Sequence, residues 1–168
     1  MMLRNTFMLT LVLAAFVAPS RAERRGDQGY GLMIGNPSGF SAKTWINETV
    51  ALDAAVGVAR SEFDIHTTLL FHKFNWTSPS FPVSMREADQ RNELPVYFGF
   101  GPRLLFEEEK EFGLRFPVGI SYLPQTSPWE FFFELAPVLR ITEEVGFNGD
   151  YAIGARYYFH AIRPMGEK

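Results

Sequence analysis

Apolar residues alternate with small or charged residues along most of this chain, from about Trp45 to Phe159. In residues 50–59 every even position from Val50 to Val58 is apolar, whereas the odd positions hold Ala, Gly and Asp53. A repeat of two is that of a β-strand with unlike faces, and it does not produce the 3.6-residue stripe of a helix. The pattern therefore predicts strands that are apolar on one face and small or polar on the other.

Turn-forming residues divide this region into eight expected strands. One long connection, Asn75–Glu93, interrupts a series of otherwise short links, and the links contain turn residues such as those of Gly35–Gly39. An even number of strands with short links is typical of an antiparallel up-and-down β-barrel. The expected strands are Tyr30–Ile34, Phe40–Ile46, Val50–Ala59, Phe63–Phe74, Leu94–Phe106, Phe112–Tyr122, Trp129–Ile141 and Asp150–Phe159.

Three prolines fall inside the expected strands. Pro102, Pro117 and Pro137 have no N–H to donate to a neighbouring strand. We expect them at bulges or bends of the barrel, with Gly99, Gly101 and Gly119 assisting the bend. The alternative is that the fifth strand begins after Pro102.

The composition of the two faces indicates which of them points outward. Eight strands enclose a space only just wide enough for side chains to fill, so the many phenylalanines of the apolar face would overfill it. The other face combines Gly with Arg, Asp and Glu, which suits a narrow lumen of paired charges better than a water-facing surface. The predicted fold is all-β: an eight-stranded antiparallel transmembrane β-barrel with its apolar face outward and a charged, Gly-rich lumen.

Charges enclosed in such a lumen need partners, because an unpaired charge removed from water is costly. Basic and acidic residues are balanced on this face, so we expect a plugged, ion-paired interior. The residues of the expected network are Lys43, Asp53, Asp64, His66, Arg103, Arg115, Glu134, Arg140 and Arg156. Glu130 and Asp150 share the same face; they and Lys43 have the alternative of meeting water at strand ends.

Aromatic residues gather at one end of the expected strands, as an aromatic girdle at a membrane interface would. The expected girdle is Trp45, Trp76, Tyr122, Trp129, Tyr157 and Phe159. If both termini are periplasmic, this count also places the connection 75–93 on the periplasmic side, where turns are usually short. Either the connection is an unusually long periplasmic segment or the strand count is off by one. The sequence does not decide whether the connection is periplasmic or extracellular.

The N-terminal residues predict export. Arg4, the apolar stretch Phe7–Val17 and the small residues Ser20 and Ala22 read as a signal peptide over residues 1–22, and the alternative is a retained helical anchor. A short leader (23–28), the barrel domain (29–159) and a tail (160–168) follow. The signal peptide contains two of the 16 basic residues and no acid, so 14 basic and 19 acidic residues remain and give a net charge of −5. This charge does not suggest nucleic-acid binding, and no cysteine is present to form a disulfide.

Six runs together resemble an uncharacterised family of small exported bacterial proteins, regarded as outer-membrane β-barrels similar to the OmpA transmembrane domain. They are GFSAKTW (39–45), ALDAA (51–55), GFGPR (99–103), RFPVGISY (115–122), FELAP (133–137) and GARYYF (154–159). The resemblance covers most of residues 29–159 and implies a fold and an outer-membrane location of a Gram-negative-type bacterium, with no activity to transfer. Such barrels commonly end on an aromatic residue that the assembly machinery reads, whereas here His160–Lys168 follow Phe159.

Candidate catalytic and metal sites are sparse. Asp64, His66 and His72 share one strand face, but Ser61 is five residues from His66, roughly 16 Å along a strand, so Ser41 or Ser121 would have to complete a lipid-acyltransferase-like triad. Three ligands spaced by two on one strand make poor tetrahedral metal geometry. A second acidic cluster, Glu107–Glu111, reads as a solvated hairpin tip rather than as a cation site.

We therefore expect a non-enzymatic outer-membrane barrel of structural, envelope-stabilising or surface-interaction type, without catalytic residues, metal or cofactor. Its expected partners are outer-membrane lipid, the barrel-assembly machinery and a protein or envelope component that binds through loop 75–93; we expect a monomer. The alternatives are a soluble periplasmic barrel that binds an apolar ligand and an outer-membrane lipid acyltransferase or deacylase. The sequence names neither a physiological role nor a ligand.

Overall fold

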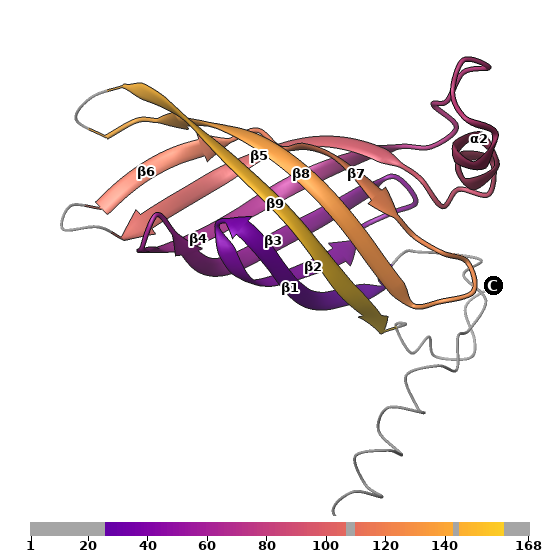
Figure 1. Cartoon of the computed structure of the whole chain (residues 1–168). Coiled ribbons are helices and arrows are strands. Elements are labelled where there is room, and N and C mark those ends of the chain that lie inside the picture. Colours follow the sequence, from indigo (N-terminus) through magenta and orange to yellow (C-terminus); the bar gives the residue numbers. More distant parts are fainter. Residues whose placement is uncertain (1–25, 107–109, 143–144, 160–168) are drawn as a thin grey trace, which may run out of the picture.

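A computed structural model describes residues 26–106, 110–142 and 145–159 of the chain. The expected signal peptide, residues 23–25 of the leader, residues 107–109 of the acidic hairpin tip and the tail 160–168 lie outside the described residues. Within the described part, antiparallel strands make up nearly all of the regular structure (Figure 1). Their bounds are β1 Gln28–Asn36, β2 Ser38–Trp45, β3 Val50–Ala59, β4 Glu62–Lys73, β5 Val96–Phe106, β6 Lys110–Arg115, β7 Val118–Tyr122, β8 Trp129–Arg140 and β9 Gly146–Phe159.

The sheet closes on itself as a ring. Each strand pairs antiparallel with its neighbours, β9 pairs with β1, and β4 pairs with β5, so the ring has no free edge among the described strands. Paired residues can be followed once around the ring from Arg156 on β9, and the walk returns to β9 at Gly146, ten residues earlier. The successive partners are Gly31, Ser41, Ala55, His66, Arg103, Gly113, Arg140 and Gly146.

The walk passes eight strand positions, because β6 and β7 occupy one position between β5 and β8. A stagger of ten residues over eight positions tilts the strands by about 40°, given a rise of ~3.3 Å per residue and ~4.8 Å between strands. Figure 1 shows the strands running diagonally around the ring.

The expected sixth strand, Phe112–Tyr122, is split into β6 and β7 at Phe116 and Pro117. The register is the same on both sides of the split, since Leu114 pairs with Leu139 and Val118 with Leu135. No residue is inserted, so the expectation of a bulge was wrong here. The missing N–H of Pro117 interrupts the ladder without shifting it, and the eight expected strands become nine elements.

The other two strand prolines also lie within unshifted strands. Pro102 pairs with Leu114 and Pro137 with Gly149, and no extra residue stands opposite either of them. Strand β5 begins at Val96, before Pro102, so the alternative start after Pro102 was wrong as well. Neither proline forms a bulge, because the register is the same before and after each of them.

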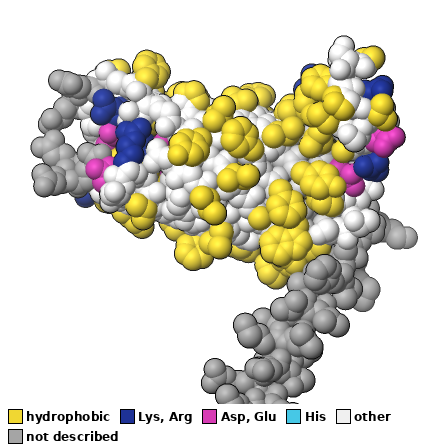
Figure 2. Space-filling model, viewed as in Figure 1, with side chains coloured by type: hydrophobic (Ala, Val, Ile, Leu, Met, Phe, Trp, Pro, Cys, Tyr) yellow, Lys and Arg dark blue, Asp and Glu magenta, His cyan; other side chains and the backbone are white. Residues whose placement is uncertain are grey.

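The alternation seen in the sequence becomes an outside and an inside. Large apolar side chains are exposed on the outer wall, as Figure 2 shows over the middle of the molecule. Inside, the apolar side chains of Met33, Ala55, Phe132 and Ala152 pack together. Inward glycines allow neighbouring strands and side chains to approach; a Cβ on Gly31, for example, would lie 1.8 Å from the carbonyl oxygen of Ala155.

The ring has two ends. The terminal rim contains the start of β1, the end of β9 and the β2–β3, β4–β5 and β7–β8 connections; the hairpin rim contains the other turns. The long β4–β5 connection carries α2 (Val83–Gln90) and lies at the terminal rim (Figure 1). This agrees with the sequence count, which placed it at the end of the termini. In the described part of the chain, no helix is long and apolar enough to cross a membrane.

Candidate functional site: the charge network inside the ring

The inward positions of the strands carry a network of charged and polar side chains. The nine residues expected in this network all lie inside the ring or at its rim, and each has a charged partner within 4 Å. Glu130 is completely buried and Asp150 is 3 % exposed, so neither they nor Lys43 meet water at strand ends. The network divides into a terminal cluster around Glu130 and a hairpin cluster around Asp150.

Glu130 on β8 is the centre of the terminal cluster. Its Oε1 accepts hydrogen bonds from Lys43 Nζ at 2.7 Å and from Ser121 Oγ at 2.6 Å. Its Oε2 accepts one from Tyr158 Oη at 2.7 Å and one from Arg156 Nη1 at 3.3 Å. Four donors from three strands, β2, β7 and β9, surround one carboxylate and satisfy a charge that would otherwise be very costly to bury.

Arg156 on β9 joins this centre to β2 and β3. Its Nη2 lies 2.6 Å from Asp53 Oδ2, and its Nε donates to Ser41 Oγ at 2.8 Å. Its guanidinium also lies 3.9 Å from the centroid of the Phe132 ring. The planar fork of an arginine suits such multiple contacts, which lysine would not provide.

Lys43 is enclosed by aromatic rings as well as by Glu130. Its Nζ lies 2.9 Å from His72 Nε2, 4.7 Å from the Trp45 ring and 5.6 Å from the Tyr97 ring. Cation–π contacts of this kind gain strength where water is excluded. The aromatic residues therefore close the terminal end of the interior around a paired ammonium group.

The hairpin cluster links β4, β5, β6, β8 and β9. Arg115 Nη2 donates to Glu134 Oε1 at 2.6 Å, and Arg103 Nε donates to Asp64, which also binds His66 Nδ1 at 2.7 Å. Asp150 Oδ2 lies 3.6 Å from the Nε atoms of both Arg103 and Arg115, beyond hydrogen-bonding distance. Two arginines thus share one carboxylate that neither of them contacts closely.

The pairing continues to the hairpin rim. Arg140 Nη1 lies 3.4 Å from Glu111 Oε2, and its side chain is 37 % exposed, so this pair contributes less than the buried ones. Glu111 itself is only 7 % exposed and also lies 3.9 Å from Arg103. The expectation of a wholly solvated tip from Glu107 to Glu111 was wrong for Glu111, because its side chain points inward from β6.

Several partners in the network were not selected for it from the sequence, where Ser41, His72 and Ser121 were considered only as candidates for a catalytic triad. The alternation of inward and outward positions along each strand already places these residues inside. They were missed because uncharged hydroxyl groups and aromatic rings are not included in a count of charges. They are Ser41, His72, Tyr97, Ser121 and Tyr158.

Trp45 was expected in the outer aromatic girdle, and the structure shows that this was wrong. This side chain is 2 % exposed and packs inside with Ala51, Leu123 and Tyr158, because it shares the inward parity of Lys43 on β2. Trp76 lies in the β4–β5 connection, where its Nε1 donates to the carbonyl of Leu94 at 2.6 Å.

The other four expected girdle residues lie on the outside at the terminal rim. Trp129 is 5.4 Å from Tyr157 and Tyr157 is 5.0 Å from Phe159, measured between ring centroids. Tyr122 is 42 % exposed on the outer face of β7. Tyr30, which was not selected, joins them at 6.1 Å from Phe159.

The serines proposed for a catalytic triad do not contact His66 in the described structure. Ser41 binds Arg156 and Ser121 binds Glu130, whereas Ser61 lies exposed in the β3–β4 turn. The described residues contain no group of three His, Asp or Glu side chains arranged to hold a metal ion. The Asp64–His66 pair therefore has the hydrogen bond of a catalytic dyad, but none of the three serines considered is hydrogen-bonded to it in the described structure.

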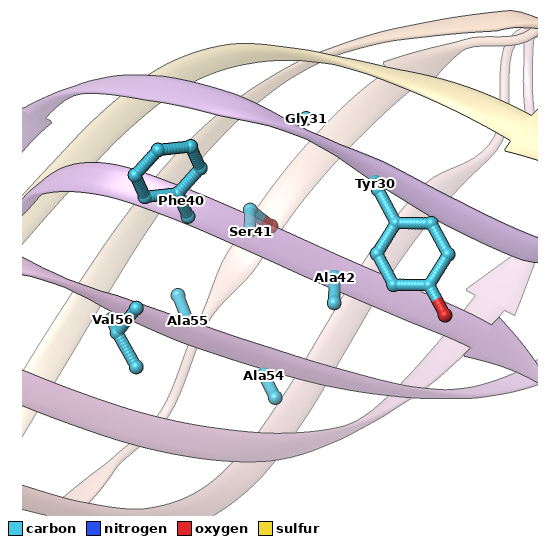
Figure 3. Close-up of a pocket in the computed structure, with 8 residues that line it drawn as sticks. All are labelled: Tyr30, Gly31, Phe40, Ser41, Ala42, Ala54, Ala55 and Val56. Carbon is cyan, nitrogen blue, oxygen red and sulfur yellow. The ribbon is translucent and has the colours of Figure 1, made fainter.

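A shallow pocket of about 220 Å³ lies on the outer wall over β1–β3. Figure 3 shows the side chains of Tyr30, Phe40 and Val56 at its border, with the small Ala42 and Ala54 between them. The pocket is apolar and opens away from the charge network.

No protein-family model, no curated protein and no solved structure matches this chain. The resemblance to small outer-membrane barrels stays a prediction, and the function must be argued from the geometry.

Proposed function

We propose that this protein is a membrane-spanning β-barrel of a bacterial outer membrane, with a structural, envelope-stabilising or surface-interaction role and no catalytic step. The observation that carries the proposal is the distribution of charge over the two faces of the strands. On the outward positions of the nine strands only Lys73 and Lys110 are charged, and each is a terminal residue of its strand. The buried charges of the strands all point inward, whereas the outward positions are apolar, which is the reverse of a soluble protein.

The height of the apolar wall supports a bilayer as its environment. Outward residues of β8 run from Trp129 to Leu139, which spans about 25 Å along the ring axis at a tilt of ~40°. This equals the ~25 Å apolar band of outer-membrane barrels. Figure 2 shows apolar side chains over the wall, with Lys, Arg, Asp and Glu confined to the two ends. The outer aromatic group at the terminal rim then lies where an interfacial girdle belongs.

The closed ladder supports the same proposal, because a bilayer interior tolerates strands only where every edge is paired. The interior contacts argue against a wide aqueous channel, since Lys43 on β2 reaches Glu130 on β8 across the lumen and Arg103 on β5 approaches Asp150 on β9. A carrier of an apolar ligand would require an apolar interior, and the charge network occupies that place here.

A protein or envelope partner would have its most accessible folded surface on the β4–β5 connection. This segment is fixed to the ring: Leu123 N donates to the carbonyl of Glu93 at 2.7 Å, and Gln125 N donates to Glu93 Oε1 at 3.0 Å. Thr77 donates through its N–H and hydroxyl to the buried Asp89 of α2, both at 2.8 Å. An ordered extension on the rim is suited to presenting a contact surface.

Membrane fractionation tests the proposal. The full chain, expressed with residues 1–22 included in a Gram-negative host, is expected in the outer-membrane fraction after carbonate washing, with a gel mobility that changes on boiling. Recovery as a soluble periplasmic protein would refute the membrane assignment. A change of envelope lipids on expression, abolished by His66→Ala without loss of folding, would instead favour the lipid-modifying enzyme.

A further inference from the structure

The wall of the ring contains a row of positions at which ladder hydrogen bonds between strands are missing. Three prolines lie in neighbouring strands, Pro102 on β5, Pro117 at the split between β6 and β7, and Pro137 on β8. We define these three residues as the proline seam. A proline provides no N–H, so each removes a hydrogen bond from the ladder.

The missing bonds fall on three adjacent strand pairs. Gly99 N donates to the carbonyl of Pro117 at 2.9 Å, and Phe116 N donates to that of Pro137 at 2.9 Å. In a regular antiparallel pair both residues exchange N–H···O bonds, but here neither proline can return one. The carbonyls of Gly99 and Phe116 therefore lose their ladder donors.

The third gap lies between β4 and β5. Pairing is continuous from Phe63 to His66 and again from Leu69 to Lys73, but it is absent opposite Pro102 and Gly101. In the register of β5, the missing bond of Pro117 lies at Gly99, that of Pro137 is level with Phe100, and the third lies at Pro102, so all three gaps lie within three residues of one another across the wall. The opposite wall, β1 to β3, is paired without interruption over its described registers.

Polar atoms without hydrogen bonds lie directly behind the seam. Thr68 and Arg115 are the inward residues on either side of Gly101, and Thr68 Oγ1 and Arg115 Nε are buried without a hydrogen bond in the described structure. The same holds for Nη1 and Nη2 of Arg103, which is 1 % exposed, and for Oδ2 of Asp150. Gly101 contributes no side chain to cover them.

The carboxylates around the two arginines offer more than one pairing. Arg103 is bonded to Asp64 and lies 3.6 Å from Asp150 and 3.9 Å from Glu111. Arg115 is bonded to Glu134 and also lies 3.6 Å from Asp150. Asp150 can thus move to either arginine by a shift of less than an ångström, since a normal hydrogen bond to a charged group is ~2.8 Å.

We propose that the proline seam is a conformational device: the ring wall opens locally there before it opens elsewhere, and this opening lets Arg103 and Arg115 exchange their carboxylate partners. Local opening of a sheet requires breaking ladder bonds, and at the seam three of them are already missing. The rest of the ring stays closed, which keeps the terminal cluster around Glu130 intact. The seam gives the interior two arrangements of charge within one fold.

Amide hydrogen exchange tests the proposal on the folded full chain in detergent micelles. We expect the amides of residues 98–101, 114–116 and 118 to exchange at least tenfold faster than those of residues 40–44 and 52–56 on the opposite wall. Pro102→Val and Pro137→Val each supply the missing N–H and should slow exchange at the seam tenfold or more. Pro128→Val, at the terminal rim, is the matched control and should leave the seam unchanged.

A labelling experiment provides an independent reading. The chain contains no cysteine, so Thr68→Cys creates a single thiol behind the seam and Met33→Cys a single buried thiol on the opposite wall. We expect a small thiol reagent to modify position 68 at least tenfold faster than position 33, and Pro102→Val to remove this difference. Equal exchange on the two walls of the unmodified protein, or equal labelling of the two thiols, would overturn the proposal even if a proline variant failed to fold.

Discussion

A charge placed on the outer wall should cost stability according to its depth in the bilayer. Ile153 and Phe147 both point outward from β9, with side chains 60 % and 78 % exposed, and they lie six residues apart. At ~3.3 Å per residue and a tilt of ~40°, this separates them by about 15 Å along the ring axis. Ile153 is then near mid-height of the wall and Phe147 near the hairpin rim.

The expected magnitudes follow from this placement. An arginine on the lipid face costs ~2–4 kcal/mol at the bilayer midplane and ~0–1 kcal/mol near the interface. Ile153→Arg should therefore lower the free energy of unfolding by about 2 kcal/mol more than Phe147→Arg does, roughly a thirtyfold difference in the folding equilibrium. On a water-exposed surface the same substitutions would change stability by about 0.5 kcal/mol or less.

The measurement is a reversible guanidinium titration of the protein in lipid vesicles, followed by tryptophan fluorescence. Ile153→Gln serves as a control for loss of the apolar side chain without a charge. Equal costs for the arginine at the two positions, or no cost at position 153, would refute the reasoning, since both outcomes require a wall that faces water throughout.

Three further outcomes are expected. Glu130→Ala should destabilise the fold by about 3–5 kcal/mol in the same titration, because it leaves buried cations without their carboxylate, and Glu130→Gln should cost less; a loss below about 1 kcal/mol would contradict the central role of this residue. In single-tryptophan variants, lipids with brominated acyl chains should quench Trp129 but not Trp45, and strong quenching of Trp45 would place it on the wrong side of the wall. Asp89→Ala removes the acceptor of Thr77, so limited proteolysis should cut residues 75–93 faster while the ring stays intact; an unchanged cleavage rate would show that this contact does not hold the segment.

Much of the strand architecture was predictable because a strand shows its two faces as a period of two. β3 and its expected bounds coincide at Val50–Ala59, and the inward position of residues such as Asp53 and Arg156 follows from parity alone. Trp45 shows the limit of grouping residues by type, since its aromatic character suggested the outer girdle while its parity with Lys43 placed it inside.

The pairing within the interior required three-dimensional information. Lys43 and Glu130 are 87 residues apart in sequence, and Arg156 and Asp53 are 103 apart. The stagger of the ring decides which acidic residue lies next to which basic residue. The stagger in turn depends on the register of every pair of neighbouring strands. The proline seam is hidden for the same reason, because Pro102, Pro117 and Pro137 become neighbours only when their strands are placed side by side.

The sequence by itself determined that the chain forms strands with one apolar and one charged face, because alternation and composition are local properties of the residues. The tertiary structure decided that these strands close into a ring with a stagger of ten residues, that Glu130 becomes a centre for four donors, and that three prolines fall on one stretch of wall. Contacts across a closed sheet depend on its circumference and tilt. Both are properties of all the strands together, so the residues of a single strand do not determine them.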